Sequence, residues 1–131
     1  MIFVDSNVPM YLVGGDHPLK QRVVELAPRL ISARERLVTS AEVFQEIIHR
    51  YRAIRETAQL GAAYEALEAM VSTVTDVTKL DVDRARSLAG QYAALSSRDC
   101  LHVAVMRRLG TTKVWSYDDG FDVVPSVQRI E

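Results

Sequence analysis

The feature that most constrains the fold of this chain is the alternation of short apolar runs with longer segments of helical periodicity. Five runs rich in valine and isoleucine predict strands at residues 2–4, 37–38, 74–77, 113–115 and 127–130. Between them, apolar residues spaced three and four apart predict helices at 18–34, 40–55, 57–71, 81–93 and 98–109. Strands joined by helices of this length form right-handed crossovers and a parallel sheet. The sequence therefore predicts a three-layer α/β/α sandwich with a central, mostly parallel sheet.

The size and composition of the chain fit one such unit, so we expect residues 1–131 to form a single domain. Hydrophobic residues make up 48% of the chain, which excludes global disorder. No apolar run approaches the roughly 20 residues that span a bilayer, so no membrane association is expected. The single cysteine, Cys100, cannot form an internal disulfide, and the first residues lack a signal-peptide pattern. Both observations indicate the cytoplasm.

Charge is distributed unevenly along the chain. The net charge of −1 does not by itself point to a nucleic-acid partner. Residues 20–55, however, carry eight lysines and arginines against four glutamates, while the remainder is acidic. A basic segment of this kind is compatible with phosphate binding, and it is also typical of a solvated helix surface.

Four acidic side chains fall where the predicted topology brings chain segments to one edge of the sheet. Asp5 follows the first strand and Asp118 the fourth, while Glu46 and Asp99 lie in helices that begin at that edge. Four neighbouring carboxylates repel one another unless some are protonated or a cation joins them. Oxygen ligands suit Mg²⁺ or Mn²⁺ better than zinc or copper, and these ions bind phosphate oxygens well. The sequence predicts a metal site that acts on a phosphate group.

Structural explanations for these acids compete with the functional one. Asp99 suits the first turn of a helix that Ser97 would cap, so its role taken singly is structural. Glu42 forms a capping-box pattern with Thr39, and we assign it that structural role. Glu46 lies one turn further on, too deep to cap, and a salt bridge within the helix is its structural alternative. The prediction of a metal site therefore rests on the convergence of acids from four chain segments at one edge of the sheet.

Cysteine, histidine and glycine-rich motifs give little support for other kinds of active site. Cys100 and His102 share an apolar helix, where we expect them to be core or helix-surface residues rather than a nucleophile or a base. The chain has no glycine-rich phosphate loop and no serine-hydrolase motif, which leaves nucleotide-fuelled and serine-hydrolase chemistry without support.

Four blocks of this sequence, in this order, resemble the PIN-domain nucleases and in particular the VapC toxins of bacterial toxin–antitoxin pairs. The blocks are the opening MIFVDSN, then TSAEVFQE at 39–46, SRDCLHVA at 97–104 and VWSYDDGFD at 114–122. Their order, spacing and total length agree, so the resemblance covers essentially the whole chain. The departures are mild: Asn7 and Ser116 replace commoner residues, and the adjacent Asp118 and Asp119 make the fourth acid less certain.

The resemblance implies a Mg²⁺- or Mn²⁺-dependent endoribonuclease that cuts structured RNA, such as tRNA or rRNA, and so blocks translation. It implies a homodimer held inactive by a cognate antitoxin, whose C-terminal segment occupies the active-site groove. The metal and catalytic residues would be Asp5, Glu46, Asp99 and Asp118, supported by Ser6, Asn7, Ser116 and Asp122. Arg50, Arg52 and Arg98 are candidates for contacts to the phosphate backbone.

The sequence is also compatible with two alternatives to a toxin ribonuclease. A housekeeping PIN-type nuclease that processes RNA or DNA would need the same acids. A non-catalytic receiver-like module also gathers acids around Mg²⁺, but it needs an aspartate after its third strand and a lysine after its fifth. Here Thr78 and Lys79 follow the third predicted strand, and the fifth runs into residues 129–131. The compact length, without an additional RNA-binding domain, favours the toxin.

Overall fold

The computed structural model describes all 131 residues and is built on a five-stranded, all-parallel sheet. The strands are β1 (Ile2–Val4), β2 (Leu37–Ser40), β3 (Thr73–Thr75), β4 (Lys113–Trp115) and β5 (Gln128–Ile130). Their spatial order is β3-β2-β1-β4-β5, so the first strand is central and the chain winds outward on one side before crossing to the other. The order reverses between β1 and β4, where an open parallel sheet forms its binding crevice.

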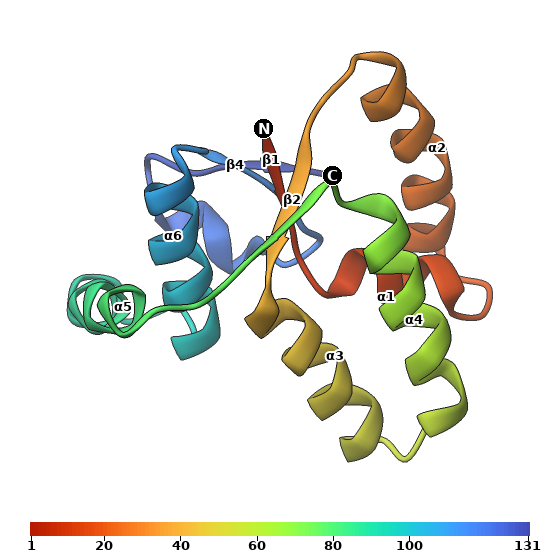
Figure 1. The fold of residues 1–131 in the computed structure, drawn as a ribbon, viewed down its shortest axis with the longest axis horizontal. Coiled ribbons are helices and arrows are strands. Elements are labelled where there is room, and N and C mark those ends of the chain that lie inside the picture. Colours follow the sequence, from red (N-terminus) through yellow and green to blue (C-terminus); the bar gives the residue numbers. More distant parts are fainter.

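Helices cover both faces of this sheet. One face carries α1 (Asn7–Val13), α2 (Pro18–Ser32), α3 (Ala41–Ala53) and α4 (Thr57–Met70); the other carries α5 (Lys79–Gln91) and α6 (Ser97–Leu109) (Figure 1). A short 3-10 helix, η1 (Asp119–Val123), joins β4 to β5. The expected three-layer α/β/α sandwich is confirmed. None of the helices is both long and apolar enough to cross a membrane.

The predicted elements are confirmed with two additions. Helix α1 was not predicted because its seven residues follow β1 almost directly and are too few to show helical periodicity. Helix η1 lies in a segment that looks like a turn. Helix α5 begins at Lys79, two residues earlier than predicted, because Thr78 Oγ1 accepts a hydrogen bond from the Asp81 amide at 3.2 Å.

Two predicted helix caps are wrong. Ser96, not Ser97, caps α6, and its Oγ accepts a hydrogen bond from the Asp99 amide at 3.1 Å. The capping box between Thr39 and Glu42 does not form. The Thr39 hydroxyl instead donates to a β1 carbonyl oxygen at 2.8 Å, because Thr39 still belongs to the buried strand β2.

The core lies between the sheet and both helical layers. All three residues of β1 are fully buried, as are Trp115 in β4 and Phe121 in η1. Cys100 is also buried, as expected of a core residue. With β1 and β4 fixed by this packing, the polar residues that follow them, Asp5 and Ser116, are held at adjacent positions on the C-terminal edge.

Candidate active site

A cavity of about 410 Å³ opens at the C-terminal edge of the sheet, and no hydrophobic residue lines it. All four predicted acids reach it from separate segments: Asp5 after β1, Glu46 in α3, Asp99 in α6 and Asp118 after β4. The remaining lining residues are His49, Arg50, Ser96, Ser97 and Arg98. Residues more than a hundred positions apart in the sequence thus share one polar cavity.

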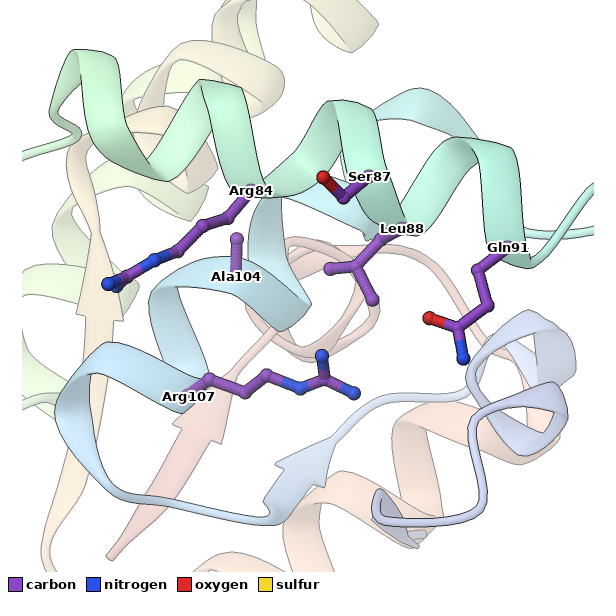
Figure 2. A pocket seen from close by; sticks show the side chains of 6 residues that line it. All are labelled: Arg84, Ser87, Leu88, Gln91, Ala104 and Arg107. Carbon is purple, nitrogen blue, oxygen red and sulfur yellow. The ribbon is translucent and has the colours of Figure 1, made fainter.

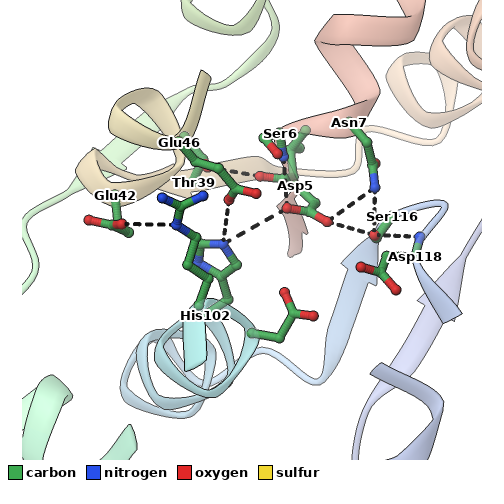
Figure 3. Close-up of polar contacts among 12 residues, drawn as sticks. Asp5, Ser6, Asn7, Thr39, Glu42, Glu46, His102, Ser116 and Asp118 are labelled. Carbon is green, nitrogen blue, oxygen red and sulfur yellow. Dashed lines mark hydrogen bonds and ion pairs between the residues drawn. The ribbon is translucent and has the colours of Figure 1, made fainter. Parts of the chain in front are cut away.

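Asp5 is the most firmly held of these acids. Its Oδ1 accepts a hydrogen bond from the Ser6 amide at 2.8 Å, and its Oδ2 accepts from Ser116 Oγ at 2.6 Å and Asn7 Nδ2 at 3.3 Å (Figure 3). Burial raises the pKa of Asp5, and the nearby His102 and the Ser116 hydroxyl offset that effect only in part. The carboxylate is therefore fixed in position while its negative charge is poorly compensated.

Asn7 and Ser116 tie the ends of β1 and β4 together. Asn7 Nδ2 donates to Ser116 Oγ at 3.2 Å, and Asn7 Oδ1 accepts from the Tyr117 amide at 3.3 Å. Ser116 Oγ also accepts from the Asp118 amide at 3.0 Å. Three residues predicted to support the site, Asn7, Ser116 and Ser6, thus lie beside the acids. The Ser6 hydroxyl is buried without a hydrogen-bond partner.

Glu46 is flanked by two cationic or cation-forming groups. Arg50 Nε lies 3.2 Å from Glu46 Oε1, and His102 Nε2 lies 3.2 Å from Oε2. Burial alone would raise the pKa of Glu46, but the hydrogen bond to His102 and the charges of His102 and Arg50 lower it. The salt bridge expected within α3 is therefore present, and the same carboxylate also lines the cavity. Glu46 is held in its ionised form.

His102 is the residue beside the acids whose place in the candidate site was not predicted from the sequence. It is buried as expected, but Nε2 faces the acids, 3.9 Å from Asp5 Oδ1. Burial lowers the pKa of His102, and this is outweighed by the hydrogen bond to Glu46 and the charge of Asp5, so the pKa is raised. One signal was available: His102 follows Asp99 by three residues, and residues three apart share one face of a helix.

Asp99 and Asp118 converge on Gly120. A Cβ atom at Gly120 would lie 3.1 Å from Asp118 Oδ1 and 3.5 Å from Asp99 Oδ2, so the glycine leaves room for both carboxylates. Burial, together with the charges of Asp5 and Asp118, raises the pKa of Asp99 to about 6. Asp118 is exposed, and its Oδ1 accepts from the Gly120 amide at 2.9 Å.

Three acidic or basic residues named from the sequence do not line the cavity. Asp122 pairs with Arg129 at 2.9 and 3.0 Å, which turns its carboxylate to β5 rather than to the other acids. Arg52 is also absent from the lining, whereas Arg50 and Arg98 are present. Glu42 lies near Arg98, with 3.8 Å between Oε1 and Nε. The structure thus gives Asp122 no contact with the acids it was expected to support.

The donor set of this cavity fits a divalent cation. Carboxylate oxygens of Asp5 and Glu46 and the Nε2 atom of His102 lie within 4.8 Å of one another, and Asp99 and Asp118 face the same cavity. Burial, with repulsion from the neighbouring acids, raises the pKa values of Asp5 and Asp99, so the protein alone does not compensate their charges. A bound cation would relieve this repulsion, and oxygen ligands favour hard ions.

A second hollow, of about 370 Å³, has the opposite chemistry. It lies between α5 and α6 and is lined by Arg84, Ser87, Leu88, Gln91, Ala104 and Arg107 (Figure 2). It contains no carboxylate and two arginines, so its charge disfavours a cation. Among the cavities of this structure, the one at the sheet edge is lined by carboxylates and the others are not.

Comparison with known proteins agrees with this architecture. The PIN domain family model matches residues 2–127. Ribonuclease VapC13 from Mycobacterium tuberculosis is 45% identical over 130 residues, which is 99% of each chain. The structure of VapC20 from the same organism, a sarcin-ricin loop cleaving toxin, matches with a TM-score of 0.72 at 23% identity over 94% of each chain. A toxin–antitoxin complex from Klebsiella pneumoniae matches with a TM-score of 0.65 at 15% identity, over 98% of this chain and 96% of that one. This chain, with its four acids at the edge of a parallel sheet, belongs to the PIN-domain family.

Proposed function

We propose that this protein is a metal-dependent endoribonuclease that acts as the toxin of a toxin–antitoxin pair. The observation that carries the proposal is the convergence of four carboxylates from four chain segments on one polar cavity. Full-length identity of 45% to a VapC ribonuclease supports RNA as the substrate class. A structured RNA such as tRNA or rRNA is the expected target, and its cleavage would block translation.

Asp5, Glu46, Asp99 and Asp118 would hold a Mg²⁺ or Mn²⁺ ion. When bound, the ion supplies positive charge that draws a phosphate group and an attacking water into the cavity. Ser116, Ser6 and Asn7 fix the Asp5 carboxylate by the hydrogen bonds described above. Glu46 contributes a permanent negative charge because its pKa is lowered.

Two arginines at the cavity are placed to bind the RNA backbone. Arg50 and Arg98 both line it, and their side chains are 47% and 33% exposed. A guanidinium presents several N–H donors in a fixed plane that matches the oxygens of a phosphate. These residues would hold the phosphodiester while water attacks phosphorus and the bond to the leaving oxygen breaks.

A groove that continues from the acid cavity is the proposed seat of the antitoxin. A hollow of about 450 Å³ shares His49, Arg50 and Arg98 with the acid cavity and continues over apolar side chains, Met10 and Ile54 among them. An extended segment with apolar residues followed by a polar end would match this change of lining.

A homodimer is also proposed, and the exposed Leu80 and Val82 on α5 provide apolar surface for it. Light scattering of the isolated protein would show whether its mass is that of a dimer.

Cleavage of tRNA and rRNA by the purified protein tests the proposal. RNA should be cut at internal sites in millimolar Mg²⁺ or Mn²⁺ and stay intact in EDTA. Asp118→Asn should abolish cleavage, while Asp119→Asn, the adjacent exposed acid outside the cavity, should not. Cleavage that continues after thorough removal of divalent ions would overturn the mechanism. Loss of cleavage in Asp119→Asn with retention in Asp118→Asn would show that the fourth acid is misassigned.

A further inference from the structure

His102 is the buried titratable residue at the acid cavity that the proposed reaction does not use. Its ring is fully buried and packs against Phe3, with the ring centroids 5.5 Å apart. One ring nitrogen, Nε2, lies 3.2 Å from Glu46 Oε2 and 3.9 Å from Asp5 Oδ1 (Figure 3). The other nitrogen, Nδ1, is buried and has no hydrogen-bond partner. The two nitrogens therefore lie in different environments, and this difference bears on what the ring does.

A metal ligand is the first role to consider, because Nε2 lies within 4.8 Å of carboxylate oxygens of Asp5 and Glu46. Ligation uses the lone pair of Nε2, which places the proton of the neutral ring on Nδ1. The Nδ1–H group would then be a buried donor without an acceptor, which is rare and unfavourable in proteins. Histidine ligands almost always donate their other N–H to a carboxylate, a carbonyl or water. No protein atom provides that second partner for Nδ1 of His102, so its surroundings disfavour ligation.

The opposite tautomer fits the surroundings on both sides of the ring. A proton on Nε2 forms a hydrogen bond to Glu46 Oε2 whether the ring is neutral or protonated. In the neutral ring it leaves only a lone pair at Nδ1, and orphaned acceptors are tolerated better than orphaned donors. Glu46 Oε1 accepts from Arg50 Nε on the other side, at 3.2 Å. The carboxylate of Glu46 is thus held at both of its oxygens, by one buried donor and one partly exposed donor.

We propose that His102 is a positioning residue that donates its Nε2–H to Glu46 and fixes that carboxylate toward the cation, without being a ligand itself. The inference rests on the proposed function, because it requires a divalent ion at the four acids. It also deepens that function, since it leaves an all-oxygen donor set at the cation. Such a set favours hard ions such as Mg²⁺ and Mn²⁺, whereas a nitrogen ligand would favour Zn²⁺.

Pulsed electron paramagnetic resonance of the Mn²⁺-loaded wild-type protein tests ligation directly. A coordinated imidazole produces modulation from its nitrogen, and we expect none from His102. His49 is the histidine that lines the cavity itself, so the His49→Gln variant is measured beside the wild type. Nitrogen modulation that persists in His49→Gln and disappears in His102→Gln would overturn the proposal.

Two substitutions of His102 test the donor role. His102→Gln keeps an N–H donor close to the position of Nε2, while His102→Leu fills much of the same volume without a donor. We expect Mn²⁺ affinity, measured without RNA, to stay within about threefold of wild type in the glutamine variant. In the leucine variant we expect it to weaken by about 10- to 100-fold, the usual effect of removing a group that orients a metal ligand. Equal affinity in both variants would overturn the proposal, and if His102→Leu does not fold, His102→Gln and the resonance spectrum decide.

These readouts separate this inference from the proposed function. A wild-type protein that binds Mn²⁺ but cuts no RNA contradicts the ribonuclease assignment, while the spectrum and the Mn²⁺ affinities still decide the role of His102. A wild-type protein that cuts RNA while His102→Leu binds Mn²⁺ normally contradicts only the positioning role. Absence of Mn²⁺ binding to the wild type would contradict both.

Discussion

Two aspartates at the same position of neighbouring helices have opposite surroundings. Asp81 is the third residue of α5 and Asp99 the third residue of α6. Each backbone amide donates to the hydroxyl of the capping residue, Thr78 for Asp81 at 3.2 Å and Ser96 for Asp99 at 3.1 Å. Both residues are buried. The two residues therefore share their position in the helix, their hydrogen bond to the capping hydroxyl and their burial.

Their carboxylates differ completely. Asp81 accepts from the Thr78 amide at 2.9 Å and from Arg108 at 2.8 and 2.9 Å, and the Arg108 hydrogen bonds lower its pKa to about 2. Asp99 forms no ion pair with arginine or lysine, and burial with neighbouring acids raises its pKa to about 6. An acid at this helical position stabilises the fold when a cation is built in beside it. Asp99 has no such cationic side chain beside it, and we propose that its carboxylate binds a metal ion instead.

The largest effect is expected for Asp99→Asn, which should abolish most of the RNA cleavage activity. Asp99→Asn keeps the shape of the side chain but removes a ligand, so we expect RNA cleavage to fall by at least about 100-fold. The metal-free variant should be as stable as wild type, or more stable by up to about 2 kcal/mol at pH 7, because a buried charge that neighbouring acids repel is removed. Gel assays of cleavage and urea unfolding measure the two effects. Cleavage at the wild-type rate would identify Asp99 as a structural helix-start residue.

The corresponding substitution Asp81→Asn should lower the stability of the fold and leave cleavage unchanged. Asp81→Asn leaves Arg108 without its charged partner and weakens the helix cap, so we expect the free energy of unfolding to fall by about 2–4 kcal/mol. Cleavage per folded molecule should be retained. Arg108→Gln is the matched partner variant, and a double-mutant cycle of the two should be strongly non-additive. An Asp81→Asn protein as stable as wild type would show that the ion pair contributes nothing.

The pH dependence of stability should differ in sign between the two acids. The folded-state pKa of Asp81 is about 2, below its ordinary 3.8, so its stabilisation is present above pH 4 and lost as the pH falls toward 2. The folded-state pKa of Asp99 is about 6, so its destabilisation grows as the pH rises from 4 to 6. In EDTA, the stability gain of Asp99→Asn over wild type should therefore appear only above pH 4. Parallel curves for wild type and both variants would contradict this assignment.

The smallest effect is expected at Glu42, whose only polar contact is the long pair with Arg98. Glu42→Gln should cost less than about 1 kcal/mol and leave cleavage near the wild-type rate. Glu46→Gln, four residues along the same helix, should abolish cleavage. If Glu42→Gln is inactive and Glu46→Gln is active, the assignment of the second sequence block is wrong.

Much of the site could be predicted because its acids follow strands with clear apolar patterns. Asp5 and Asp118 come after β1 and β4, and the parallel topology brings such strand ends to one edge. Glu46 and Asp99 were placed by the same topology, combined with the order of the four blocks. The family match also leaves no support for the receiver-like alternative. Periodicity and topology brought these acids to one edge of the sheet, and the resemblance to the family blocks selected Glu46 and Asp99 as site residues.

The remaining contacts depend on side-chain packing between segments far apart in the sequence. Asp81 pairs with Arg108 across 27 positions, and His102 reaches Glu46 across 56. Asp122 was expected near the site from the resemblance of residues 114–122 to the fourth family block, but the 3-10 helix η1 turns it toward Arg129. Neither spacing nor composition determines which acid pairs with which basic side chain, and that pairing separates Asp81 and Asp122 from the acids that we propose as metal ligands.

The central claim is that Asp99 belongs to a site completed by a divalent ion, and Mg²⁺-dependent stabilisation of three proteins tests it most directly. Ion binding to the native state should raise the free energy of unfolding of wild type by about 2.7 kcal/mol at a Mg²⁺ concentration one hundred times the Kd. Asp81→Asn should gain the same increment from a lower starting stability, and Asp99→Asn should gain little or none. An equal increment in Asp99→Asn and wild type would contradict the claim.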